Sequence, residues 1–187
     1  MPSLRDADQL RPNDRAGALD AYAALQDGIA VDDADRILWI CSQVAPTPPA
    51  SLEPLLERVA DGGPTHLRRA AVHGRATIAW FEGRADDAER HWTRGLRFPD
   101  APRDRFWIRS ALNLGTLYFQ RHRLFEPLVL TGMGRRAARE AGHPDLAAYA
   151  SLRRAEVLLR MGATLEARDE VQQALGDQTG VTDEGQR

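Results

Sequence analysis

The chain has 187 residues, 43% hydrophobic and 28% charged, with a formal net charge of −2. This composition is typical of a soluble helical protein with a sizeable core. The single cysteine, Cys41, excludes an intramolecular disulfide framework and suits a reducing compartment. No apolar run approaches the length of a membrane span, and the N-terminus lacks the apolar stretch of a signal peptide. We therefore expect a cytoplasmic protein.

All 25 basic residues are arginine, so lysine-based Schiff-base and P-loop chemistry are excluded. The charge is distributed unevenly. Residues 1–64 carry 5 arginines against 11 acids (net −6), residues 65–160 carry 18 against 10 (net +8), and residues 161–187 carry 2 against 6 (net −4). An acidic end beside a basic middle permits either an acidic partner or self-association.

The N-terminal third predicts accessory helices rather than repeats. Residues 1–12 lack an apolar period and are expected to be loosely ordered. Helices are expected over about 14–27, from about 32 to 44, and over 51–60. The proline-rich segment 45–49 predicts an extended connector between the last two. Residues 1–64 are thus interpreted as one accessory region, in a chain expected to form a single structural unit.

Two amphipathic helices are then expected to fold back on each other across Gly83, because glycine adopts positive φ without steric cost. Ala76 and Ala79 share a face of the first helix and permit close approach. Ala88 and Trp92, four apart on the second helix, form a small–large pair that can interlock with that face. Trp92 is therefore expected in the core.

The same hairpin recurs twice at a nearly constant spacing. The turn position moves from Gly83 to His122 to Gly162, in steps of 39 and 40 residues. A small residue in the second helix moves in parallel, through Gly95, Gly134 and Ala174. The second hairpin is expected over about 103–120 and 126–141. Trp107 matches none of these core landmarks, so we expect it to contribute less than Trp92.

The motif Ala111-x2-Leu114-Gly115-x2-Tyr118, with Ala88-x3-Trp92, resembles the tetratricopeptide repeat, whose signature is W-x2-L-G-x2-Y…A-x3-F. The period matches long variants of about 40 residues. The resemblance implies an all-α fold, with three antiparallel hairpins over 65–176 stacked as a right-handed superhelix. An ordinary antiparallel bundle is the alternative. Residues 177–187 are too polar to fold and are expected to form a disordered tail.

The resemblance also implies a concave groove formed by the first helix of each hairpin. Its expected lining is Thr77, Trp80, Arg109, Asn113, Thr116, Phe119, Gln120, Tyr149, Arg153, Glu156 and Arg160. Some family members hold a peptide carboxylate in a clamp, and here Asn113 and Arg153 match that clamp. Glu156 is expected to neutralise Arg153 or Arg160 within its own helix. The aromatic side chains of this set either line the groove or pack between repeats.

No catalytic, cofactor or metal-binding motif is apparent. The five histidines form neither H-E-x-x-H nor a Cys/His cluster, and no G-x-S-x-G or G-x-G-x-x-G occurs. The pair Asp86–Asp87 falls where a helix begins, so the helix dipole accounts for it. We expect no enzymatic activity, no cofactor and no metal.

The predicted function is a non-catalytic adaptor or regulatory module that binds a peptide or protein segment, possibly acidic, in the groove. Two alternatives stay open. The cluster Arg135-Arg136-x2-Arg139 could contact phosphates in a nucleic-acid-associated regulator, although the acidic whole chain disfavours this. The charge asymmetry could also support a self-assembling scaffold, so a homo-oligomer is possible. Gly132 and Gly134, inside a helix, predict either close helix packing or a hinge.

Overall fold

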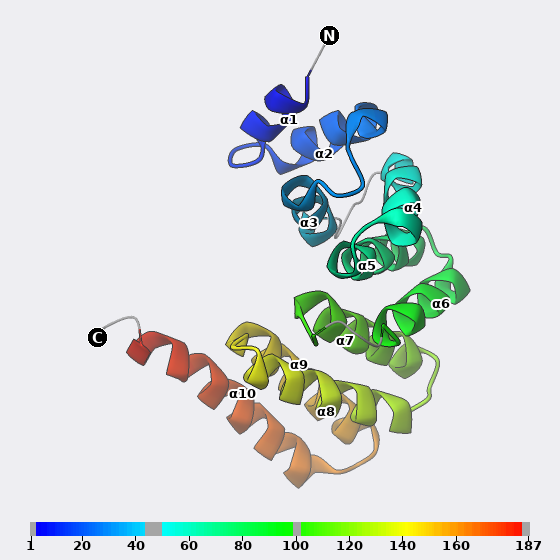
Figure 1. The fold of residues 1–187 in the computed structure, drawn as a ribbon. Helices are drawn as coiled ribbons and strands as arrows, with labels where there is room; N and C mark the ends of the chain where they lie inside the picture. Colours follow the sequence, from blue (N-terminus) through cyan, green and yellow to red (C-terminus); the bar gives the residue numbers. More distant parts are fainter. Residues whose placement is uncertain (1–2, 44–49, 99–101, 185–187) are drawn as a thin grey trace. The chain divides into compact units, whose positions relative to one another are not determined.

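A computed structural model describes residues 3–43, 50–98 and 102–184, and its regular elements are all helical (Figure 1). The all-α prediction is therefore confirmed for this part of the chain. The α-helices are α1 (Leu4–Leu10), α2 (Arg15–Ala24), α3 (Ala34–Gln43), α4 (Glu53–Gly62), α5 (Thr65–Phe81), α6 (Ala85–Leu96), α7 (Arg105–Gln120), α8 (Phe125–Glu140), α9 (Pro144–Arg160) and α10 (Thr164–Glu184). The predicted connector over 45–49 lies outside the described residues.

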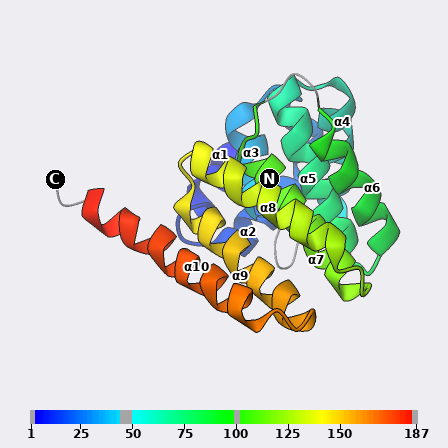
Figure 2. The same ribbon diagram turned by 90° about the horizontal axis from the view of Figure 1, so that it is seen from below.

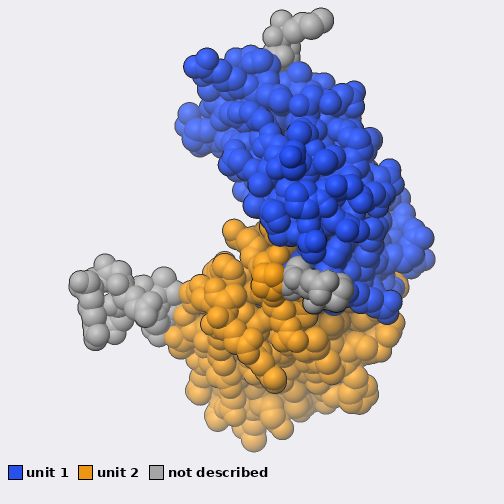
Figure 3. Space-filling view, viewed as in Figure 1, with its two compact units in different colours: residues 1–101 blue, residues 102–187 orange. Residues whose placement is uncertain are grey.

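Contacts between residues divide the chain into two compact units, coloured separately in Figure 3. Unit 1 is residues 1–101 and holds α1 to α6, whereas unit 2 is residues 102–187 and holds α7 to α10. The sequence placed its boundaries at residues 64 and 176 instead. A single stack of three hairpins therefore remains a prediction.

In unit 1, helix α1 occupies residues that the sequence predicted to be loosely ordered, so that prediction was wrong. Ser3 caps the helix, and its hydroxyl and amide both donate to the Asp6 carboxylate at 2.8 Å. The Arg36 guanidinium on α3 holds Asp8 with two hydrogen bonds of 3.1 and 2.7 Å. Only Ala7 of α1 is buried. Polar contacts therefore position this helix, and an apolar period could not reveal it.

The core of unit 1 forms around α5, which contacts α3, α4 and α6. Ala76, Ala79 and Ala88 are fully buried, and Trp92 is 1% exposed. The indole of Trp92 lies 5.9 Å from that of Trp80, centroid to centroid. The predicted small–large packing between α5 and α6 is therefore confirmed.

The predicted turn positions adopt the expected backbone conformation. Gly83, His122 and Gly162 have φ of 78°, 60° and 81°, and Gly142 between α8 and α9 has φ of 69°. After each comes an amide that bonds back to the last helical turn; for example, Arg84 N donates to Ala79 O at 2.8 Å. The recurrence read from the sequence thus corresponds to one repeated way of ending a helix.

Within unit 2, α7 contacts α8 and α9, and α9 also contacts α8 and α10 (Figures 1 and 2). Gly134 lets α8 approach α7, because an added Cβ would lie 2.9 Å from the Leu112 side chain. Gly132 faces the guanidinium of Arg154, which would lie 3.0 Å from an added Cβ. Both glycines therefore serve close packing, the first of the two predictions. Trp107 is 5% exposed and so belongs to the core of unit 2, while its smaller contribution relative to Trp92 remains a prediction.

Helix α10 is held by an unusual combination of contacts. Among its side chains up to residue 177, where burial is described, the buried ones are Ala167, Ala174 and Glu170. The Glu170 carboxylate accepts hydrogen bonds from Arg135 on α8 and, at 2.9 Å, from Arg154 on α9. The helical backbone continues to Glu184, through residues that the sequence assigned to a disordered tail. Helix propagation is the physical reason, since each added residue gains one backbone bond.

Candidate functional site

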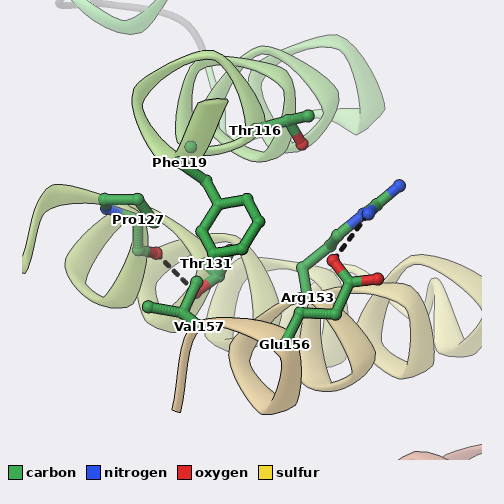
Figure 4. Close-up of a pocket in the computed structure, with 8 residues that line it drawn as sticks. Thr116, Phe119, Pro127, Thr131, Arg153, Glu156 and Val157 are labelled. Atoms are coloured by element: carbon green, nitrogen blue, oxygen red, sulfur yellow. Dashed lines mark hydrogen bonds and ion pairs between the residues drawn. The ribbon is translucent and has the colours of Figure 1, made fainter. Parts of the chain in front are cut away.

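The candidate site is a pocket in unit 2 between α7, α8 and α9 (Figure 4). It brings together residues separated by up to 42 positions in the chain, because α8 packs against both α7 and α9. Its lining residues are Gly115, Thr116, Phe119, Pro127, Thr131, Arg153, Glu156 and Val157.

The aromatic ring of Phe119 forms the apolar part of the pocket. In Figure 4 it extends from α7 toward Thr131 and Val157, and the Thr131 hydroxyl donates to the Pro127 carbonyl at 2.6 Å. The Arg160 guanidinium sits 5.8 Å from the ring centroid. Phe119 is half-buried, so part of the ring remains available to another apolar group.

The polar part of the pocket is built on one turn of α9. Arg153 donates to the Glu156 carboxylate at 2.7 Å and to the Tyr149 hydroxyl at 2.9 Å, and its guanidinium lies over the Tyr149 ring at 4.9 Å. Burial acts to lower the pKa of Arg153, while the bonds to Glu156 and Tyr149 raise it by more. The expected neutralisation of Arg153 by Glu156 is therefore confirmed, and the pair presents both a cation and a carboxylate.

The structure brings some of the predicted groove residues to this pocket. Thr116, Phe119 and Arg153 line it, and Tyr149 and Arg160 contact its members. The other predicted members in unit 2, which do not line it, are Arg109, Asn113 and Gln120. Burial and the nearby Arg105 lower the pKa of Arg109, which stands on the same helix as Thr116.

Two predicted groove residues, Thr77 and Trp80, belong to unit 1. Thr77 is 4% exposed and its hydroxyl donates to the His73 carbonyl at 2.9 Å. A buried hydroxyl already bonded within its own helix cannot contact a partner, so the prediction for Thr77 was wrong. Trp80 is half-buried against Trp92.

Sequence reasoning missed the contribution of α8. Pro127 and Thr131 of α8 line the pocket, but only first helices were expected to supply its lining. Gly115 was identified as part of the repeat motif, and it lines the pocket where α7 meets α8: an added Cβ would make ordinary contacts with Thr131, Leu130 and Pro127 at 3.6–3.7 Å. The repeat motif therefore identified Gly115, although the motif could not place this residue in the pocket because that position depends on how the helices pack.

Most of the basic cluster on α8 is engaged in ion pairs with α10. Arg135 bonds to Glu170 and to the Gln173 side chain, the latter at 2.8 Å. Arg139 forms a two-bond pair with Asp177 at 3.0 and 2.9 Å. Two of the three arginines proposed to contact phosphates are thus already neutralised, which weakens the nucleic-acid alternative.

No cluster of metal-ligating side chains occurs among residues 3–43, 50–98 and 102–184. Across the same described residues, no helix has the length and hydropathy needed to cross a bilayer. Comparisons with protein-family models, curated proteins and solved structures found no match to this chain.

Proposed function

We propose that this protein is a non-catalytic, cytoplasmic interaction module, an adaptor or regulator whose unit 2 binds a peptide or protein segment in the α7–α9 pocket. The supporting observation is the juxtaposition of a partly exposed Phe119 ring with Arg153 and Glu156 in one hollow. In this proposal the three hairpins stack as a right-handed tetratricopeptide-like superhelix. The repeated helix-ending turns are compatible with that arrangement.

The chemistry of the pocket favours a segment with an apolar anchor next to an acidic group. An apolar side chain would cover the exposed part of Phe119, and a carboxylate would bond to Arg153 or Arg160. Glu156 competes for Arg153, at 2.7 Å, so the segment must displace or bridge that pair. This competition limits the affinity and favours segments that also supply a hydrogen-bond donor to Glu156.

The experiment is selection of peptides from a displayed random library on the immobilised full chain, followed by measurement of each Kd by fluorescence anisotropy. Selected peptides should be enriched in acidic residues next to apolar ones. We expect Arg153→Glu to weaken binding at least about tenfold, equivalent to 1.4 kcal/mol. The matched control is Arg168→Glu on α10, because Arg168 is 67% exposed and its side chain lies outside the pocket.

Two results would contradict the proposal. Peptides that bind Arg153→Glu as tightly as the wild type would place the binding surface elsewhere. A loss of helicity in Arg153→Glu, measured by circular dichroism, would show that Arg153 has a structural role instead. Phe119→Ala tests the apolar anchor independently, because removal of the aromatic ring should weaken peptide binding without changing any charge.

A further inference from the structure

A second surface of unit 2 lies along the exposed face of α8, and its apolar side chains do not line the α7–α9 pocket. Phe125, Val129 and Met133 are 74%, 61% and 38% exposed. Spaced four residues apart, they form one row along the helix; we call them the α8 stripe. The opposite face of α8 is the buried one, with Pro127, Thr131, Gly134, Ala137 and Ala138. The α8 stripe is therefore a second apolar face of this helix, in addition to the face that packs in the core of unit 2.

The surface next to the stripe is hollowed. Val129 and Met133 border a depression that Gly132 and Arg154 also line, and the Arg154 guanidinium lies against Gly132, 3.0 Å from where a Cβ would stand. A shallow depression beside protruding apolar side chains can receive a side chain from a partner helix. Arg136 and Glu140 continue the same border toward the end of α8.

The charges that flank the stripe alternate along the helix. Glu126 stands near its start and Arg136 near its end, ten residues or about 15 Å apart. Glu126 is 39% exposed and is paired with Arg123 at 2.6 Å. Arg136 is exposed and makes no ion pair with any residue in the described part of the chain. A helix with an acid at one end and a base at the other is electrostatically complementary to its own antiparallel copy.

We propose that the α8 stripe is the interface of a two-fold symmetric dimer, in which α8 of one copy lies antiparallel on α8 of a second copy. With the axis near residue 131, Val129 of each copy faces Met133 of the other. Glu126 of each copy then faces Arg136 of the other, so both ion pairs form at once.

The pattern favours a second copy over an unrelated acidic helix. A two-fold interface requires one patch to be complementary to itself, and the Glu126–Arg136 polarity meets that requirement. An acidic partner would instead meet carboxylates at Glu126 and at Glu140. A parallel arrangement of two copies would place each charge against its equal. Because three apolar side chains from each copy form a small interface, the dimer is weak and its population depends on concentration.

The first test is sedimentation velocity of the full chain from about 1 to 500 µM, a range chosen for an interface at the small end of the known sizes. The wild type should shift from monomer to dimer over this range. Val129→Glu should reduce association at least about tenfold, because each new carboxylate would be desolvated against Met133 of the other copy. Leu165→Glu is the matched control: Leu165 is 67% exposed on α10, so the same change there should leave association unaltered.

The second test reverses the two charges separately. Arg136→Glu alone and Glu126→Arg alone should each weaken self-association, because each creates two like-charged contacts. Mixing the two variants should restore a dimer of one copy of each, in which all four charges are again complementary. Circular dichroism of each variant verifies that both remain folded.

These measurements can overturn the proposal in three ways. A wild type that stays monomeric to about 500 µM shows that a second copy does not cover the stripe. Association that is unchanged in Val129→Glu places the dimer interface elsewhere. Folded charge variants that fail to associate on mixing refute the antiparallel pairing. None of these outcomes bears on the α7–α9 pocket, so peptide binding by that pocket is tested separately.

Discussion

The most demanding prediction concerns Glu170, which links three helices of unit 2. Its side chain is 9% exposed and bonds to Arg135 and Arg154, whose side chains are 19% and 22% exposed. We consider Glu170→Gln, which preserves the shape of the side chain and removes its charge. Arg154 also donates to the Leu128 carbonyl at 2.6 Å, so its guanidinium retains one bond in the variant.

The expected loss of stability follows from the charged hydrogen bonds that Arg135 and Arg154 lose in this variant. A hydrogen bond to a charged group contributes about 1.5–3 kcal/mol, and breaking a buried ion pair costs about 3–5 kcal/mol. Both arginines reach solvent in part and can recover hydration, so the lower end applies. We expect Glu170→Gln to destabilise unit 2 by about 3 kcal/mol. This corresponds to opening of α10 that is about 100-fold more frequent.

The assay is hydrogen exchange of peptides from α9 and α10, because exchange reports the opening of these two helices separately from the rest of the chain. Asp169→Asn is the matched control: the neighbouring acid becomes an amide, but Asp169 is 62% exposed and its contact to Arg168 is 3.8 Å. That variant should change protection little. Equal protection of α10 in Glu170→Gln and the wild type would refute the conclusion that this carboxylate holds the helix in place.

Two further predictions test packing and burial. Gly134→Ala should lower the free energy of unfolding by up to about 2 kcal/mol in urea melts, because overpacking against Leu112 exceeds the gain in helix propensity. Gly176→Ala, where an added Cβ meets nothing within 4 Å, should instead raise it by up to about 1 kcal/mol. Burial, with a smaller contribution from Arg75, lowers the pKa of His91 from 6.5 to about 4. The unfolded chain therefore binds a proton more readily, and stability should fall as pH drops from 6.5 toward 4. In urea melts recorded at a series of pH values, His91→Gln should remove this decrease in stability between pH 6.5 and about 4.

The local features of the hairpins could be predicted from the sequence because single residues determine them. Gly83 and Gly162 identify turns through their backbone freedom, and Ala88 with Trp92 identifies a helix–helix contact. His122 was placed only by its spacing from the two glycines, and its φ of 60° agrees with them.

The remaining features depend on partners that are distant in the chain. Helix α1 is positioned by polar bonds such as Arg36 to Asp8, 28 residues away, which no apolar period indicates. Arg135 appeared to be a free cation in the sequence, but its partner Glu170 lies 35 residues later on a helix that also contacts α9. The pocket likewise needs Pro127 from a second helix. Such contacts require the packed arrangement of helices, and residue spacing alone does not determine it.

The contact surface of α10 has a consequence for protein design. Ala167 and Ala174 present a nearly smooth face to α9, so side-chain interdigitation does little to fix how far the helix is displaced along its axis. The bonds of Glu170, one turn beyond Ala167, provide that alignment. Asp177 and Gln173 add bonds to Arg139 and Arg135 on α8. A helix designed to replace α10 must therefore keep the two alanines together with these three polar side chains, whereas exposed positions such as Leu165 can be chosen freely.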